Sequence, residues 1–366
     1  MKIMIVLGIE SSCDETAAAI VENGQRLLAN VVRTQIDIHK AYGGVVPEVA
    51  ARSHIEVINP VIRQALSEAN LTWADIDAIA VTYAPGLIGS LMVGSLAART
   101  LAIIHDKPLY PIHHVEAHVY ANFITENKSS SPSLPLPLNQ PEFPMLALIV
   151  SGGHSQLALF RDHGDYELLG QTQDDAVGEA FDKVAKILGL PYPGGPSIAT
   201  AAQLGNPSKY RLPKARLSGR FDFSFSGLKT AVLRAVQKDL DVDFTFPSSE
   251  IPARLSDVQR QDFAASFQHT AIETLVDKTE LAFKDFQPRS VVIAGGVAAN
   301  QELRRQLSAR LPLKIDYAPV ELCTDNAAMI GALGYYYAQK NQPADPYSLE
   351  VIPSISMTKT AWSKVN

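Results

Sequence analysis

The chain has 366 residues, of which 46% are hydrophobic and 19% charged, so it can bury sizeable cores and is not disordered as a whole. At about 150 residues per domain, this length favours two domains. The net charge of −6 excludes a generally basic nucleic-acid coat, but it leaves a local basic patch open. Two cysteines, Cys13 and Cys323, exclude a disulfide scaffold and favour a reducing, cytoplasmic location. Arg99 interrupts the longest apolar stretch, so we expect no membrane span, and the N-terminus lacks the features of a signal peptide.

The first part of the chain alternates strands and helices. Short apolar runs predict strands over Ile3 to Ile9, Thr16 to Val21, Arg26 to Val32, Ile76 to Thr82 and Leu109 to Ile112. Helical spacing of isoleucine and leucine predicts a helix over Ala50 to Ala69, and a small-residue helix is expected over Gly89 to His105.

A similar order recurs later in the chain. Strands are expected over Met145 to Val150, Gln156 to Phe160, Tyr166 to Gly170 and Val291 to Ala294, followed by a helix from about Asn300 to Arg310. Both halves therefore contain a three-strand meander, then helices, then a strand that ends in a glycine turn. This repetition predicts a duplicated, two-lobed α/β fold.

Three segments lie outside this repeated plan. Lys128 to Pro144 is rich in proline and serine, which suits an extended linker between lobes. Asp239 to Ser256 is expected to be an exposed loop. The tail after Pro343 is loop-like, and the sequence leaves open whether it packs on the surface or frays.

The strongest metal signal is the stretch from His113 to His118. On a helix, His114 and His118 are four residues apart and project from one face, which suits two nitrogen ligands on one divalent ion. The stretch lacks the H-E-x-x-H pattern of zinc proteases, and an exposed polar helix end is the alternative. Asp325, which precedes a small-residue helix over Ala327 to Ala338, is the candidate third ligand, and Cys323 is a softer rival.

Glycine turns form a second group of candidates. Ser151-Gly152-Gly153-His154 joins two strands, Gly295-Gly296 links a strand to a helix, and Gly194-Gly195 precedes a helix. Glycine lets backbone N–H groups approach a phosphate, although each turn alone is compatible with a structural role. None of them fits the Walker or the G-x-G-x-x-G pattern. Together, at corresponding ends of two lobes, they predict a nucleotide between the lobes.

Acidic residues give a weaker signal. Glu10, Asp14 and Glu15 follow the first strand, where they could bind a metal, steer water, or be solvated turn residues. Asp182 lies on a predicted helix, where it could accept hydrogen bonds from ribose hydroxyls or be an ordinary surface carboxylate.

A basic stretch runs from Lys209 to Arg234. It holds seven basic residues against one acid, Asp222, and it is interleaved with Tyr210, Phe221, Phe223 and Phe225. Cations for phosphates and aromatic rings for stacking are what RNA contact requires. The alternative is a solvated loop beside ordinary core phenylalanines.

In its motifs the chain resembles the bacterial tRNA N6-adenosine threonylcarbamoyltransferase family, whose members were formerly described as O-sialoglycoprotein endopeptidases. The matching stretches span nearly the whole chain in order: GIESSCDET (Gly8 to Thr16), YGGVVPEVAARSH (Tyr42 to His54), APGLIGSLMVG (Ala84 to Gly94), HHVEAH (His113 to His118), VSGGHSQL (Val150 to Leu157), DDAVGEAFDKVAKILGLPYPGGP (Asp174 to Pro196), DFSFSGLKT (Asp222 to Thr230), IAGGVAAN (Ile293 to Asn300) and CTDNAAMI (Cys323 to Ile330).

The resemblance implies the two-lobed actin-like ATPase fold, with duplicated RNase H-like lobes and a central nucleotide cleft. Residues 1–143 would form the first lobe, completed by residues 325–366, and residues 144–324 the second. His114, His118 and Asp325 would hold one Fe²⁺ per subunit, with Zn²⁺ or another divalent ion as the alternative. The residues that would line the substrate site are Ile149, Val150, Ser151, Gly152, Gly153, Asp182, Gly195 and Asn300.

The implied reaction moves a threonylcarbamoyl group from threonylcarbamoyl-AMP to N6 of the adenosine 3′ to the anticodon, in tRNAs that read codons beginning with A. No residue is assigned as general base. The implied partners are tRNA, an inactive sister protein of the same fold and a small P-loop ATPase, with no membrane. The alternatives are a small-molecule kinase of the same fold and a non-catalytic nucleotide-binding scaffold; the histidine pair has no role in the kinase.

Overall fold

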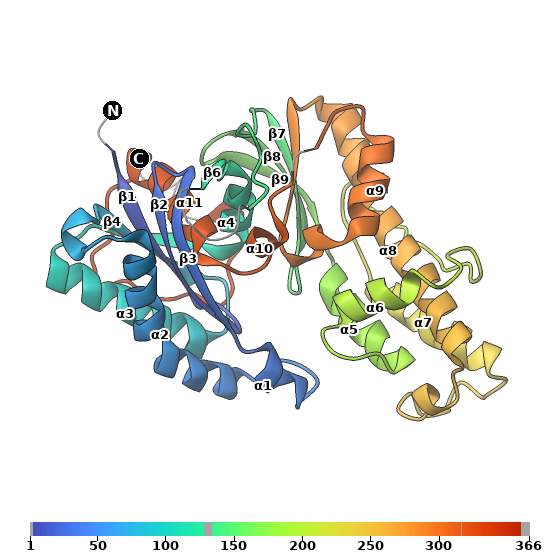
Figure 1. Ribbon diagram of the computed structural model, residues 1–366. Helices are drawn as coiled ribbons and strands as arrows, with labels where there is room; N and C mark the ends of the chain where they lie inside the picture. The colour runs from blue at the N-terminus through green and yellow to red at the C-terminus, as the bar shows by residue number, and fades with distance from the viewer. Residues whose placement is uncertain (1–2, 128–133, 316, 360–366) are drawn as a thin grey trace.

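The computed structural model describes residues 3–127, 134–315 and 317–359, which form two lobes, each built on one β-sheet (Figure 1). The first sheet has the strand order β5-β4-β1-β2-β3-β6 and the second has the order β10-β7-β8-β9. The predicted Lys128 to Pro144 linker lies partly outside the described residues.

The first sheet starts as an antiparallel meander of β1 (Ile5–Glu10), β2 (Glu15–Glu22) and β3 (Arg26–Thr34). β4 (Ala78–Ala84) lies parallel to β1, with Gly8 opposite Ala80, and β5 (Leu109–His113) extends the sheet beyond β4. The short β6 (Glu126–Asn127) pairs with β3 at the other edge.

The second sheet repeats this plan. β7 (Met145–Val150), β8 (Ser155–Asp162) and β9 (Asp165–Gln171) form the antiparallel meander, and β10 (Ser290–Ala294) lies parallel to β7. The predicted repetition of a meander followed by a returning strand is confirmed. The residue boundaries expected for the two lobes stay a prediction.

Helices cover both faces of the first sheet because alternate strand residues on both faces are apolar. One face packs against α2 (Pro47–Ala69) and α3 (Ile88–His105), and α1 (Ile36–Lys40) precedes them. The other face packs against α11 (Ala327–Lys340). Small residues allow this close approach: a Cβ on Gly8 would lie 2.3 Å from the carbonyl oxygen of Ala327.

The second lobe carries α5 (Val177–Leu188), α6 (Gly194–Ala202), α7 (Ser226–Asp239), α8 (Asp257–Phe286), α9 (Gln301–Arg310) and α10 (Val320–Cys323). The 30-residue α8, which we did not predict, begins at a capping box between Ser256 and Gln259. The segment expected as an exposed loop before it contains a 3-10 helix at Ile251–Ala253, whose Ile251 side chain is buried. Other 3-10 helices lie at Trp73–Asp75, Ala121–Phe123, Gly296–Ala299 and Met357–Lys359.

One helix of the described chain, α3, is long and apolar enough to cross a membrane by length and composition. It packs along α2 and against β4, and 33% of it is buried.

The short helix α4 (His114–Tyr120) follows β5 directly and lies where the two lobes meet. It contacts β5 and α11 of the first lobe and also β7 and β10 of the second sheet (Figure 1). Side chains on α4 are therefore placed at the junction between the lobes.

Candidate metal centre between the lobes

The two histidines of α4 are positioned by the way this helix begins. His113 ends β5 and is the N-cap of α4, because its Nδ1 accepts a hydrogen bond from the backbone N–H of Glu116 at 3.4 Å. His114 and His118 then lie one turn apart, and both side chains are buried. Their rings are 4.6 Å apart between centroids.

Asp325 completes a three-ligand group with this pair. Its Oδ1 lies 3.5 Å from Nε2 of His114 and 3.3 Å from Nε2 of His118, and one ligand atom from each of the three residues lies within 4.8 Å of the others. Two ligand atoms at about 2.1 Å from one ion are about 3.4 Å apart at a tetrahedral angle. Within the described chain, neither ring nitrogen of the buried His118 has a hydrogen-bond partner. A divalent cation fits these donors, because it would satisfy a nitrogen that is otherwise left without a partner.

Glu10 holds His114 in the orientation that a metal ligand needs. The Glu10 side chain has no exposed surface, and its Oε2 lies 3.0 Å from Nδ1 of His114. Its two oxygens also accept hydrogen bonds from the Ser12 N–H at 2.5 Å and the Thr82 hydroxyl at 2.6 Å. A carboxylate on one imidazole nitrogen directs the other nitrogen toward a metal. From sequence, Glu10 was a candidate metal ligand or a solvated turn residue. In the structure it is buried and supports His114 instead.

The charges at this centre favour a cation. Burial opposes protonation of His114, but the carboxylates of Glu10 and Asp325 raise its pKa to about 9. Burial likewise opposes ionisation of Asp325, yet His114 and His118 hold the pKa of its carboxyl well below its usual range. The group therefore attracts positive charge whether a proton or a metal ion provides it.

Cys323 does not compete for the metal. Its thiol is buried, donates to the carbonyl oxygen of Ala318 at 3.4 Å and accepts from the Arg304 guanidinium at 3.6 Å. Of the two ligands considered from sequence, Asp325 is the one that lies with the histidines.

A further carboxyl group, that of Glu15, and the thiol of Cys13 lie near the centre. Burial, followed by the charges of Asp325 and Asp14, raises the pKa of Glu15 well above its usual value. Glu15 also accepts a hydrogen bond from the hydroxyl of Thr34 at 3.1 Å. Burial together with Asp14 and Asp325 raises the pKa of the Cys13 thiol as well. Burial and the charges of Asp14 and Asp325 therefore favour the neutral forms of Glu15 and Cys13.

The glycine turn after β7 faces the centre from the second lobe. Burial, followed by the charges of His114 and His118, lowers the pKa of His154 in this turn to about 4. A Cβ on Gly152 or Gly153 would meet no atom of the described residues within 4 Å, so both glycines face open space. The side chains of Ile149 and Val150 are fully buried, so only the backbone at the end of β7 can face a substrate. The sequence places His154 in the glycine-turn motif but does not indicate its proximity to His114 and His118.

Asp182 and Gly195 meet at a second turn. The Asp182 Oδ1 accepts a hydrogen bond from the Gly194 N–H at 2.6 Å, and a Cβ on Gly194 would lie 2.5 Å from Cα of Asp182. Gly195 itself has no atom of the described chain within 4 Å of an added Cβ. This loop therefore presents the open backbone of Gly195 beside the carboxyl of Asp182.

Asn300 has a structural role that the substrate-site expectation did not include. Its Oδ1 accepts hydrogen bonds from the N–H groups of Glu302 and Leu303 as the N-cap of α9. Its Nδ2 donates to Oε1 of Gln268 at 3.0 Å. Its side chain is therefore already engaged in capping.

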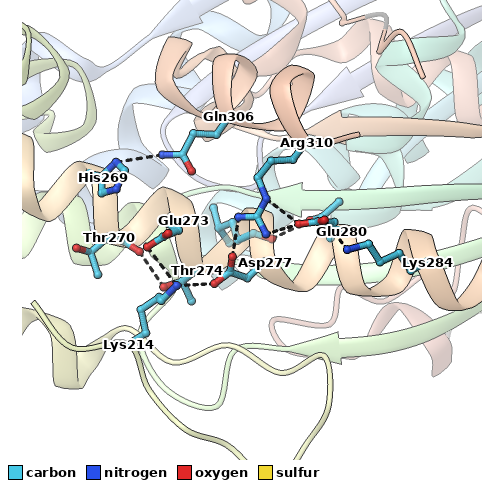
Figure 2. Close-up of polar contacts among 12 residues, drawn as sticks. Lys214, His269, Thr270, Glu273, Thr274, Asp277, Glu280, Lys284, Gln306 and Arg310 are labelled. Atoms are coloured by element: carbon cyan, nitrogen blue, oxygen red, sulfur yellow. Dashed lines mark hydrogen bonds and ion pairs between the residues drawn. The ribbon is translucent and has the colours of Figure 1, made fainter. Parts of the chain in front are cut away.

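The basic stretch is anchored to α8. Figure 2 shows Lys214 between Glu273 and Asp277, at 3.1 and 2.6 Å, within a network that continues through Arg310 and Glu280. Arg220 pairs in the same way with Asp285 at 2.8 Å. Lys209, Arg211 and Arg216 are exposed, and in the described part of the chain no ion pair or hydrogen bond holds their side chains. Lys214 and Arg220 therefore anchor the segment to α8, whereas Lys209, Arg211 and Arg216 are free cations in the described chain.

The aromatic residues of this stretch pack within or against the core of the second lobe. Phe223 and Phe225 are fully buried, and Tyr210 stacks on Phe263 at 3.7 Å between ring centroids. These rings belong to the core of the second lobe, which was the alternative interpretation. Burial excludes stacking of bases on Phe223 and Phe225.

The comparisons agree with the motifs. The family model described as tRNA N6-adenosine threonylcarbamoyltransferase matches residues 26–332. The protein of that name from Thermomicrobium roseum is 49% identical over 93% of this chain and 94% of its own length. The one from Symbiobacterium thermophilum is 49% identical over 96% of this chain and 97% of its own length. Among solved structures, HypF of T. kodakarensis is 14% identical with a TM-score of 0.56, and the match covers 92% of this chain and 48% of HypF. The fold is the two-lobed actin-like ATPase fold.

Proposed function

Because the chain belongs to the tRNA N6-adenosine threonylcarbamoyltransferase family, we propose that His114, His118 and Asp325 hold a divalent cation for this transfer. The enzyme transfers the threonylcarbamoyl group to N6 of adenosine in tRNA. The observation that carries the metal proposal is the buried imidazole of His118, which has no hydrogen bond in the described chain and lies 3.3 Å from Asp325, beside a His114 already oriented by Glu10. Two imidazoles and a carboxylate suit Fe²⁺, and Zn²⁺ is the alternative.

The reaction needs positioning more than a strong base. The donor, threonylcarbamoyl-AMP, is a mixed anhydride, so AMP is a good leaving group, whereas the adenine amine is a weak nucleophile. A bound cation supplies Lewis acidity, which polarises a carbonyl or phosphate oxygen. No side chain is assigned as the acceptor of the amine proton.

The charge of the cleft explains why a cation is required. Asp325 and Asp14 lie on one side, and Asp182 lies on the other lobe near Asp14. A phosphate would be repelled by these carboxylates unless positive charge intervened. We therefore expect the metal to be needed for binding of the donor as well as for transfer.

The glycine turns provide donors for the developing negative charge. The open backbones of Gly152, Gly153 and Gly195 allow N–H groups to approach a substrate oxygen without interference from a side chain. One such donor contributes roughly 3–4 kcal/mol to acyl transfer in enzymes where this has been measured. These backbones and Asp182 form the proposed donor-binding site.

The partners follow from the family. We propose that tRNA contacts the free cations Lys209, Arg211 and Arg216, and that the sister protein and the small P-loop ATPase act with this chain. The outer face of α3 exposes Ile88, Met92, Leu96 and Ile104, an apolar surface that suits a protein partner.

The test is a direct assay. The purified chain, with and without the sister protein and the ATPase, is incubated with tRNA and threonylcarbamoyl-AMP, and the nucleosides are analysed by mass spectrometry. Threonylcarbamoyladenosine formed by the wild type but not by Asp325→Asn supports the proposal. ATP-dependent phosphorylation of a small molecule would identify a kinase instead, and absence of product in every arm would identify a scaffold.

A further inference from the structure

The C-terminal strap, residues 344–359, runs across the first lobe toward α4. It begins where the N–H of Ala344 donates to the carbonyl oxygen of Leu109 on β5. The Arg99 guanidinium on α3 then donates to three of its carbonyl oxygens, those of Pro346 at 2.5 Å, Tyr347 at 2.7 Å and Leu349 at 3.3 Å. One side chain therefore clamps the first half of the strap.

The strap continues along the end of β4. The N–H of Ile352 donates to the carbonyl oxygen of Tyr83 at 2.9 Å, and the Gly86 N–H donates to that of Pro353 at 3.1 Å. These bonds place the strap at the edge of the sheet where β5 ends and α4 begins.

At that edge the strap binds the residue that caps the metal-binding helix. Because Nδ1 of His113 accepts the N–H of Glu116, its Nε2 carries the proton and donates to the carbonyl oxygen of Ile355 at 3.1 Å. His113 is buried and adjacent to His114 in sequence. A single imidazole thus links the strap to the first turn of α4.

The end of the strap reaches the second lobe. Met357 is buried, and its carbonyl oxygen accepts the hydroxyl of Tyr166 on β9 at 2.7 Å. The same hydroxyl lies 3.0 Å from Oε2 of the buried Glu116, on the turn of α4 between the two histidine ligands. Strap, metal-binding helix and second sheet therefore meet at one point.

We propose that the C-terminal strap positions the metal-binding helix through two of its carbonyl oxygens: that of Ile355, which binds His113, and that of Met357, which is linked to Glu116 through Tyr166. The strap would fix the orientation of His114 and His118 relative to Asp325. The effect of the strap on metal binding therefore rests on the proposed metal centre. The strap itself contributes none of the proposed metal ligands or donor-binding residues.

The test releases the strap without touching the ligands. Arg99→Gln removes the clamp on α3, and Met357→Ala empties the buried contact, whereas Met357→Leu keeps its volume. Arg63→Gln, an exposed arginine on the neighbouring α2, is the matched control. The readouts are hydrogen exchange over residues 113–120 and 344–359 in the metal-free protein, and titration with Co²⁺ followed by its visible spectrum.

Faster exchange over residues 113–120 in Arg99→Gln and Met357→Ala, with about tenfold weaker Co²⁺ binding and an altered spectrum, supports the proposal. Met357→Leu and Arg63→Gln should match the wild type. Exchange that rises in the strap but not in α4 overturns it. If neither variant releases the strap, a chain ending at Pro343 is judged by the same criterion. A wild type that binds no Co²⁺ refutes the metal centre, while the exchange measurement still decides the role of the strap.

Discussion

Nδ1 of His114 lies 3.0 Å from Oε2 of Glu10, a carboxylate with no exposed surface. The two residues come from different elements, since Glu10 ends β1 and His114 begins α4. Their contact directs Nε2 of His114 toward Asp325, so the orientation of the proposed metal ligand is set by a residue outside the ligand group.

Glu10→Gln tests this supporting role. We expect metal affinity to fall about 10- to 100-fold, because the neutral amide is a weaker acceptor for the imidazole N–H. Competition with a chelator measures the affinity. Glu167→Gln, an exposed glutamate on β9, serves as the control. Unchanged affinity in Glu10→Gln would contradict the role of Glu10.

His114→Ala and Asp325→Ala should both lose the metal and the transfer activity while the lobes stay folded. We expect His114→Ala to be the less stable variant, by about 3–5 kcal/mol relative to wild type, because it leaves the buried Glu10 carboxylate without its charged partner. Elemental analysis and chemical denaturation measure the two effects. Stoichiometric metal in both purified variants would refute the ligand assignment.

Arg211→Ala combined with Arg216→Ala should weaken tRNA binding and reduce the slope of log affinity against log salt by about one per lost phosphate contact. Lys214→Ala combined with Arg220→Ala should mainly loosen the segment, because Lys214 is paired with Asp277 of α8 (Figure 2) and Arg220 is paired with Asp285 of α8. Filter binding at several salt concentrations compares the pairs. Equal salt slopes for the first pair and the wild type would place tRNA elsewhere.

His163, in the turn between β8 and β9, predicts a pH effect on stability. Burial, followed by Lys340, lowers its pKa to about 4 despite the charge of Asp162, and its ring stacks on Tyr336 at 3.9 Å. The unfolded chain takes up this proton near pH 6.5 and the folded chain only near pH 4. Stability contributed by the neutral ring is therefore complete above pH 6.5 and is lost as pH falls toward 4.

His163→Phe should remove this contribution, because phenylalanine keeps the ring contact and does not titrate. Urea denaturation of both proteins between pH 4 and pH 8 gives the comparison. Below pH 6.5, the free energy of unfolding should fall less steeply in His163→Phe than in the wild type. Identical pH profiles would show that His163 is not protonated differently in the two states.

The sequence by itself determined the strands, the repetition and the placement of His114 and His118 on one helix face. Met145 to Val150 is an apolar run short enough to favour a buried strand, and the four-residue spacing of His114 and His118 needs nothing but a helix to bring them onto one face. Asp325 could be named because it precedes a small-residue helix, although its distance from the pair could not be derived from spacing. These are local properties, which follow from the spacing of apolar residues and the composition of short segments.

Tertiary structure decided what each polar residue contacts. Glu10 and His114 are 104 positions apart, and only the pairing of β1 with β4 and of β4 with β5 brings them together. The same holds for Lys214, whose positive charge suggested RNA until its pairing with Asp277 became visible, and for the tail, whose packing depends on Arg99 and His113. Contacts between residues far apart in sequence leave no periodic pattern. Each polar residue, seen alone in the sequence, could equally well be exposed to solvent.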